Sequence, residues 1–297
     1  MTNRPVSPGG LRPSWKLRSN AVRDPAPNVD RKVWRDERLS EGKRTIPEET
    51  AIALTYSGGT YAVMMGTPQD LADFAIGFSL SEGIVKAPDQ IQSLEIVDLD
   101  DGIELRMWLA QADTDRLHDR RRQMAGPTGC GICGVESIAE ALRSAATVEG
   151  GRSFSAQEIV AAMRAMPPLQ SINIETRAVH AAAFFMPGRG IVALREDVGR
   201  HNALDKLAGA LARAKLAGAE GMVLLTSRIS VEMVQKVAAM GATVMVAVSA
   251  PTALAVRTAE AAGITLAAIA RADGFETFTH PHRIAPISVT QGAVHVA

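Results

Sequence analysis

The two cysteines of this 297-residue chain, Cys130 and Cys133, lie three positions apart in the run GPTGCGICGVE at residues 126–136. A thiolate is a nucleophile, a metal ligand and a redox group, so a close pair predicts chemistry of one of these kinds. Four glycines in the same run favour a loop that can change conformation. A helix expected from about Val135 would direct its positive dipole end toward the thiols and favour their deprotonated form.

The residues alone leave several interpretations of this pair open. A thioredoxin-type dithiol is expected early in a compact βαβ domain, whereas this pair follows a basic helix in mid-chain. A persulfide carrier needs a nucleophilic thiolate that can reach both a donor and an acceptor, and a glycine-rich loop suits it. The cysteines could also be incidental to a structural loop. A zinc site would need two more ligands, for which the candidates are His180, His201, His280 and His282.

A second group of polar residues follows four expected strands in the second half of the chain. Ligands of open α/β sheets bind where strands end and helices begin. The segments at these ends read DVGRHN, SRIS, SAPT and RADG, and they suit phosphates and polar heterocycles. Helix capping and surface ion pairing are the alternative for each residue taken singly. The group comprises Asp197, Arg200, His201, Asn202, Ser227, Arg228, Ser230, Ser249, Thr252 and Arg271.

The elements that must position these residues predict an α+β protein of two domains. A small mixed module over 46–125 is expected from two hairpins and a helix at 70–82. After the cysteine loop at 126–136, a second domain over 137–297 begins with an expected helix at 137–145, and the box SAQE at 155–158 caps the next helix. Uninterrupted apolar strands (MVLLTS, TVMVAVS, ITLAAIA) then alternate with helices, which predicts parallel βαβ units with both sheet faces covered.

Composition excludes several classes of protein. Residues 1–44 carry eleven Lys or Arg against five Asp or Glu among scattered prolines, so 1–45 is expected to be a disordered basic arm. The net charge of the whole chain is zero, which argues against a general nucleic-acid or membrane-surface role. Neither a signal peptide nor an apolar run of membrane-spanning length is present, so a cytoplasmic protein is expected.

Several long motifs together resemble one known family. They are GFSLSEGIV at 77–85, CGICGVE, EDVGRHNALDK at 196–206, SRISVEMVQK at 227–236, SAPTALAV at 249–256 and THPHRI at 279–284. In this order they resemble the formate dehydrogenase accessory sulfurtransferases, the FdhD family. The resemblance runs from about residue 48 to the end of the chain and leaves only the basic arm outside.

This resemblance implies a sulfurtransferase that takes sulfur from a cysteine desulfurase as a cysteine persulfide. It would pass that sulfur to the molybdenum of the bis-molybdopterin guanine dinucleotide cofactor, a bound substrate, before the cofactor enters formate dehydrogenase. The family implies a homodimer without a permanent metal, and a C-terminal cytidine-deaminase-like domain of three α/β/α layers.

The family motifs also assign roles to residues. Cys130 matches the persulfide carrier and Cys133 its auxiliary cysteine, whose role is less defined. Strand-end positions add Arg200, His201, Ser227 and Arg228 as further candidates for cofactor binding. The binding segment itself falls on Ile269, Ala270, Arg271, Ala272, Asp273 and Gly274.

The chain departs from the family pattern in two places. Members of the family usually have a Thr-Gly-Gly pattern just before the histidine that matches His180. This chain reads ETRAVH up to that histidine, so Arg177 and Ala178 replace the two glycines. Asp273 is an acid where phosphates are expected, and it could repel the ligand or pair with Arg271. The alternative function from another class is a non-catalytic chaperone of the molybdenum cofactor, with structural or zinc-bound cysteines.

Overall fold

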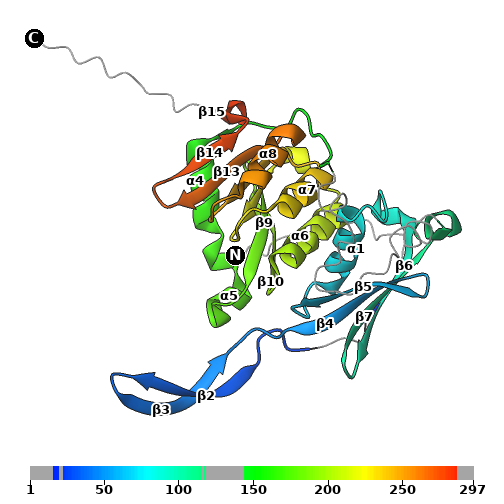
Figure 1. The fold of residues 1–297 in the computed structure, drawn as a ribbon, viewed down its shortest axis with the longest axis vertical. Helices are drawn as coiled ribbons and strands as arrows, with labels where there is room; N and C mark the ends of the chain where they lie inside the picture. Colours follow the sequence, from blue (N-terminus) through cyan, green and yellow to red (C-terminus); the bar gives the residue numbers. More distant parts are fainter. Residues whose placement is uncertain (1–15, 20–22, 116, 118–143, 286–297) are drawn as a thin grey trace, which may run out of the picture. The chain divides into compact units, whose positions relative to one another are not determined.

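The computed structural model describes residues 16–19, 23–115, 117 and 144–285 (Figure 1). Cys130 and Cys133, with the whole run 126–136, lie outside the described residues. The chain divides into two compact units. Unit 1 comprises 1–143, 172–180 and 195–217, and unit 2 comprises 144–171, 181–194 and 218–297.

This division corrects the expected domain boundary at residue 137. Two segments of the second half, 172–180 and 195–217, belong to unit 1 rather than to the domain expected over 137–297. The physical reason for this division is a helix within 195–217 that packs along a helix of the first half. The residues that lead into it also form hydrogen bonds and ion pairs with the first half. Local periodicity carries no information about such long-range packing.

Unit 1 contains a five-stranded sheet with the order β1-β6-β7-β4-β5. The two expected hairpins are confirmed, since β4 pairs with β5 and β6 with β7 in antiparallel fashion, and the central pair β4–β7 is parallel. Fully buried Ile52, Leu54 and Leu105 contribute to its apolar core. The strands are β1 (Lys16–Ser19), β4 (Thr50–Tyr56), β5 (Gly59–Gly66), β6 (Ile91–Leu99) and β7 (Gly102–Leu109).

Two helices of unit 1 lie in close contact. They are α1 (Leu71–Ser81), which confirms the expected helix, and α6 (Arg200–Ala214). A Cβ on Gly77 would stand 1.7 Å from the Asp205 carbonyl oxygen, and a Cβ on Gly209 would stand 1.9 Å from the Asp73 carbonyl oxygen. The two glycines therefore permit a backbone-to-backbone approach that no larger residue allows.

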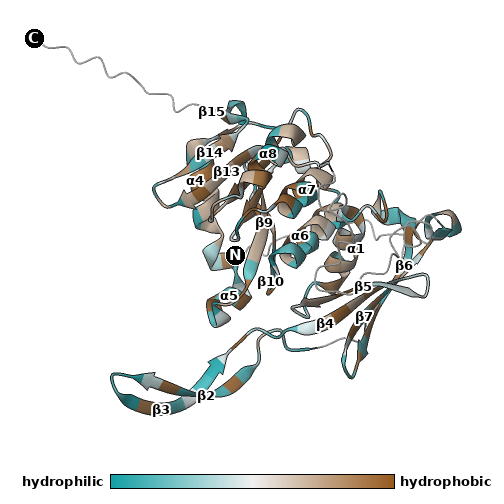
Figure 2. Cartoon of the chain, viewed as in Figure 1, coloured by the Kyte–Doolittle hydropathy of each residue, from teal (hydrophilic) through white to brown (hydrophobic). Residues whose placement is uncertain are grey.

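Residues 28–45 form a hairpin where a disordered arm was expected. Strands β2 (Asn28–Arg35) and β3 (Arg38–Thr45) pair in antiparallel register without a shift. Asp36 and Glu37 occupy the two-residue turn with φ of 47° and 60°, the left-handed values of a type I′ turn. The sequence pattern missed this hairpin because its turn lacks glycine and its strands carry many charged residues. Figure 2 shows hydrophilic and hydrophobic stretches side by side in both strands.

Unit 2 is built on a six-stranded sheet with the order β10-β9-β11-β12-β13-β14. As expected, β11, β12 and β13 are parallel, while β9 and β14 run antiparallel to their neighbours. Strand β14 was not expected. The strands are β9 (His180–Met186), β10 (Gly190–Asp197), β11 (Met222–Leu225), β12 (Val244–Ala247), β13 (Thr265–Arg271) and β14 (Gly274–Thr279), with the short pair β8 (Phe154–Ser155) and β15 (Ile284–Ala285).

Helices accompany this sheet. Helix α4 (Ala156–Ala165) buries Ile159 and Met163 in one core with Ala183 and Leu224 of the sheet. Helices α7 (Val231–Ala239) and α8 (Ala253–Ala262) contact each other, and α8 contacts β13 (Figure 1). The mixed α/β class is thus confirmed, whereas the cytidine-deaminase likeness stays a prediction. The remaining helical pieces are α5 (Ser171–Thr176) and the 3₁₀ turns Pro88–Gln90, Pro167–Leu169, Gly218–Glu220 and Pro281–Arg283.

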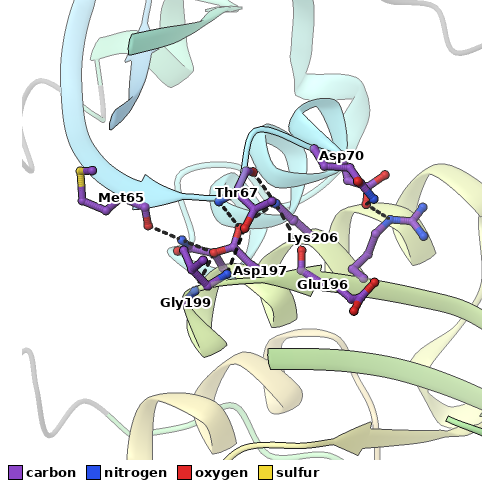
Figure 3. Close-up of polar contacts among 11 residues, drawn as sticks. Met65, Thr67, Asp70, Glu196, Asp197, Gly199 and Lys206 are labelled. Carbon is purple, nitrogen blue, oxygen red and sulfur yellow. Dashed lines mark hydrogen bonds and ion pairs between the residues drawn. The ribbon is translucent and has the colours of Figure 1, made fainter. Parts of the chain in front are cut away.

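A buried ion pair fixes the start of α6 in unit 1. Lys206 Nζ lies 2.6 Å from a carboxylate oxygen of Asp197, and both side chains are wholly buried (Figure 3). Asp197 also accepts hydrogen bonds from the backbone N–H groups of Thr67 at 3.0 Å and Gly199 at 2.7 Å. Lys206 in turn donates to the Thr67 carbonyl at 2.9 Å. This network, called here the Asp197 clamp, joins α6 to the loop between β5 and α1.

Further buried acids hold the same region together. Glu196 accepts from the backbone N–H groups of Ile172 at 3.0 Å and Asn173 at 2.8 Å, which satisfies orphan donors at the start of α5. The carboxylate of Asp73 on α1, 3% exposed, lies 2.7 Å from Arg195 and 2.5 Å from Arg213. These contacts explain why segment 195–217 belongs to unit 1.

The glycine crossing predicts a specific sensitivity. Gly77→Ala should lower the stability of the chain by about 2 kcal/mol or more, because overpacking against a fixed backbone outweighs the gain of about 1 kcal/mol that alanine brings to a helix. The midpoint of urea unfolding, followed by circular dichroism, measures this. Gly42→Ala in β3, where an added Cβ meets no atom within 4 Å, is the matched control and should stay within about 0.5 kcal/mol. Equal midpoints for the two variants would contradict the crossing.

The Asp197 clamp predicts a larger effect. Lys206→Met should destabilise the chain by about 3 kcal/mol or more, because Asp197 is then a buried charge without a counter-charge. The control is Lys32→Met, which removes one end of an exposed pair with Glu41, whose side chains are 67% and 76% exposed. That change should cost less than about 1 kcal/mol. Differential scanning calorimetry on both variants makes the comparison, and a Lys206→Met chain as stable as the control would refute the role of the pair.

Candidate functional site

Three loops of unit 2 lie at one edge of its sheet. Because β11, β12 and β13 are parallel, the segments that follow them leave from the same edge. Hydrogen bonds join two of these segments, from Val248 N–H to the Leu225 carbonyl and from Thr252 N–H to the Ile229 carbonyl, both at 3.0 Å. The expectation that the SRIS, SAPT and RADG segments share an edge is therefore confirmed for unit 2.

Ser227 and Arg228 differ in what they offer a ligand. Ser227 is 3% exposed, and its hydroxyl donates to the Arg228 carbonyl at 3.1 Å, so it serves the loop conformation. Arg228 is exposed, and its guanidinium makes no ion pair with the described residues. Arg228 is thus the member of this pair that can meet an anion.

The predicted cofactor segment Ile269–Gly274 spans the end of β13, a two-residue turn and the first residue of β14. Ile269 has φ of 54°, a left-handed conformation that is strained for a β-branched residue, and the register shifts between Ala268 and Arg271. Strain of this kind persists where the surroundings enforce it, and it gathers at binding sites. The segment therefore carries a backbone feature typical of function.

Hydrogen bonds hold the shape of this segment. Arg271 donates to the carbonyl of Ala270 at 3.0 Å and also to the carbonyl of Val248, while Arg164 on α4 donates to the carbonyl of Ala272. Asp273 is exposed, and no ion pair joins it to Arg271 within the described part of the chain. Of the two effects considered for Asp273, pairing with Arg271 is thus not observed.

Two helices begin at the same edge of unit 2. Thr252 caps α8 by accepting from the Ala255 N–H at 3.2 Å, which supports the capping interpretation for this residue. Ser230 occupies the N-cap of α7 without a side-chain cap bond, and its buried hydroxyl oxygen meets no hydrogen-bond partner among the described residues. A buried hydroxyl of this kind at a helix N-terminus fits an anionic oxygen.

Arg200 and His201 lie in unit 1, in the first turn of α6 directly after the Asp197 clamp. The Nε of Arg200 is buried and has no acceptor among the described residues. Burial lowers the pKa of the nearby His180 below its ordinary value, and the charge of Arg200 adds to this effect, while Asp197 opposes it. His180 and Arg200 form a small polar group that the strand-end argument found only in part, since His180 begins a strand rather than follows one.

The replaced glycine at Arg177 has a structural explanation. Arg177 follows the last residue of α5 with φ of 61°, and its N–H donates to the Asn173 carbonyl at 2.9 Å. A residue after a helix end with left-handed φ is the position where glycine is preferred. The arginine therefore accepts a modest backbone strain of about 1 kcal/mol in a helix cap.

The structure brings the predicted residues together only within each unit. Ser227, Arg228 and Ile269–Gly274 share one edge of unit 2, and Arg200 and His201 share the start of α6 in unit 1. In residues 16–19, 23–115, 117 and 144–285, no three His, Cys, Asp or Glu side chains gather as a metal site. None of the described helices is both long and apolar enough to cross a bilayer.

Comparison with known proteins gives consistent matches. The model of the FdhD/NarQ family matches residues 47–285. The chain is 50% identical to the sulfur carrier protein FdhD of Agrobacterium fabrum over 86% of this chain and 95% of that protein. It is 53% identical to the sulfur carrier protein FdhD of Brucella abortus over 83% of this chain and 92% of that protein.

A solved structure supports the same fold. The crystal structure of a candidate formate dehydrogenase accessory protein from Desulfotalea psychrophila aligns with a TM-score of 0.68. The alignment covers 88% of this chain and all of the other, at 23% sequence identity. Because the family model covers most of the chain and the curated relatives share half of its residues over most of their length, the chain belongs to the FdhD/NarQ family.

Proposed function

We propose that this protein is a sulfur carrier required for formate dehydrogenase activity. The observation that carries the proposal is its identity of 50% and 53% with two sulfur carrier proteins over more than four-fifths of the chain. Similarity of this extent supports a shared activity, and the CxxC pair supplies a thiol able to carry sulfur. The accessory role also agrees with the name of the structural relative.

Cys130 is the proposed carrier. Its thiolate attacks the outer sulfur of a persulfide on the donor, a cysteine desulfurase; a new sulfur–sulfur bond forms on Cys130 while the old one breaks and the donor cysteine leaves as a thiolate. From the glycines at 126, 129, 131 and 134 in the sequence, we expect a loop that can meet a donor and then an acceptor. Cys133 is the proposed auxiliary thiol. Both cysteines lie outside the described residues, so sequence supports this step.

The proposed acceptor is the molybdenum of the bis-molybdopterin guanine dinucleotide cofactor, bound as a substrate. Its phosphates call for cations, backbone N–H groups and hydroxyls. Unit 2 offers Arg228, the helix start at Ser230 and the strained segment Ile269–Gly274 along one sheet edge. In unit 1, Arg200 and His201 are the further candidates, and the buried Nε of Arg200 suits an anionic acceptor.

The remaining features of the proposal concern partners and location. The protein would act in the cytoplasm as a homodimer and would meet a cysteine desulfurase and formate dehydrogenase in turn. The competing function is a chaperone that shelters the molybdenum cofactor without carrying sulfur, with structural or zinc-bound cysteines. The two functions differ in whether Cys130 gains sulfur.

The proposed sulfur-carrier function predicts a mass change on Cys130. Incubation with a cysteine desulfurase and cysteine should add about 32 Da, one sulfur atom, to the parent protein and to Cys133→Ala, but not to Cys130→Ala. Intact-protein mass spectrometry reads the adduct, and loss of the adduct on reduction identifies it as a persulfide. An adduct that persists on Cys130→Ala would contradict the assignment of the carrier to Cys130, whereas stoichiometric zinc on the parent protein would favour the chaperone.

A further prediction concerns the edge of unit 2 that we propose binds the phosphates. Arg228→Gln should weaken the binding of guanosine diphosphate, used as a probe for the nucleotide part of the cofactor, by about tenfold, the effect of one lost charge-assisted hydrogen bond. Arg257→Gln, on an exposed position of α8 in the same unit, removes the same charge and should leave affinity within about twofold. Isothermal titration calorimetry measures both, and equal affinities for the two variants would place the nucleotide elsewhere.

A further inference from the structure

The hairpin β2–β3 has almost no core of its own. It is a two-stranded sheet, and no third strand of the described chain joins it. All but two of its strand residues, Val33 and Thr45, are exposed, and Trp34 is 74% exposed. Isolated two-stranded hairpins are marginal in water. A hairpin that pairs without a register shift over its full length, yet buries almost nothing, suggests a surface that binds a partner molecule.

The two faces of the hairpin differ sharply in charge. Side chains alternate between faces along each strand, and directly paired residues share a face. One face carries Arg31 and Arg35 of β2 with Arg38 and Arg44 of β3, and it carries no acid. The opposite face balances two acids against two lysines. Its residues include Asp30, Lys32, Glu41 and Lys43, together with the apolar pair Trp34 and Leu39.

The arginine face is electrostatically unsatisfied within the described chain. Arg35 and Arg38 are directly opposite each other, and like charges in that position destabilise a hairpin. Neither they nor Arg31 form an ion pair with any described residue. Arg44 alone is engaged, donating to the Thr176 carbonyl at 3.2 Å. A carboxylate placed between Arg35 and Arg38 would turn this repulsion into two charge-assisted contacts.

We infer that the arginine face of β2–β3 docks an acidic segment of a partner protein. Arginine forks match carboxylates in bidentate geometry, and the valines between the arginines offer apolar contact. Nucleic acid fits less well, because the aromatic residue that could stack on bases, Trp34, lies on the other face. This inference stands apart from the sulfur-transfer proposal.

The test uses the full-length chain and dye-labelled poly-L-glutamate as the acidic probe. The double variant Arg31→Gln/Arg35→Gln should bind the probe about tenfold more weakly than the parent chain. The matched control, Lys32→Gln/Lys43→Gln, removes the same charge from the opposite face of the same hairpin and should change affinity less than about twofold. Fluorescence anisotropy at several salt concentrations measures binding, which should weaken as salt screens the charges.

Three outcomes would overturn the inference. Equal losses in the two double variants would show that net charge and not the arginine face governs binding. No loss in either would place the probe on another surface. Tighter binding of a dye-labelled DNA duplex, lost specifically in Arg31→Gln/Arg35→Gln, would assign the face to nucleic acid. Because the readout involves no sulfur, a failure here is distinct from a failure of Cys130 to form a persulfide.

Discussion

The buried pair of Asp197 and Lys206 is the constraint on which unit 1 depends. Two charges removed from water are costly unless each has a full set of partners, and here the network nearly supplies them. Asp197 accepts from Lys206, from two backbone N–H groups and from Asn202 at 3.1 Å. Lys206 reaches Asp197 and the Thr67 carbonyl. The start of α6 can therefore occupy one position relative to the β5–α1 loop and not a range of them.

This constraint explains the polar motif EDVGRHNALDK. From sequence, Asp197, Arg200, His201 and Asn202 of this motif were candidates for ligand binding, yet Asp197 and Asn202 belong to the clamp. Other residues of the motif are structural as well: Glu196 caps α5, Lys206 pairs with Asp197, and Asp205 accepts from Ser81 at 2.6 Å. The Nε of Arg200 has no acceptor among the described residues, and it lies at the point where the clamp holds the helix start. A rigid frame around the Arg200 guanidinium is what a site for an anionic substrate needs, because a preorganised site loses little order on binding.

Much of the fold followed from local pattern. The strands β11, β12 and β13, their parallel order and the SAQE capping box appear as expected, with Ser155 accepting from the Glu158 N–H at 3.1 Å. Strand β14 was missed although Asp273-Gly274 is a hairpin signal, because the RADG run was interpreted only as a loop for ligands. The division of the chain could not be predicted, since it rests on contacts such as Asp73 with Arg195 and Arg213, far apart in sequence.

The candidate site was predicted by residue type but not by conformation. Polar side chains at strand ends can be read from a pattern, whereas the φ of 54° at Ile269 and of 61° at Arg177 cannot, because neither residue favours that region. The hairpin β2–β3 shows the same limit, with Asp36 and Glu37 in a turn that usually calls for asparagine and glycine. At Ile269 and Arg177 the surrounding contacts set the backbone, and in the hairpin the two-residue connection between the paired strands sets it. Arg195, whose side chain is 25% exposed, has a carboxylate partner in Asp73, while the arginines of β2–β3 have no carboxylate partner in the described part of the chain. They lie in water, where a charge is stable until a partner arrives.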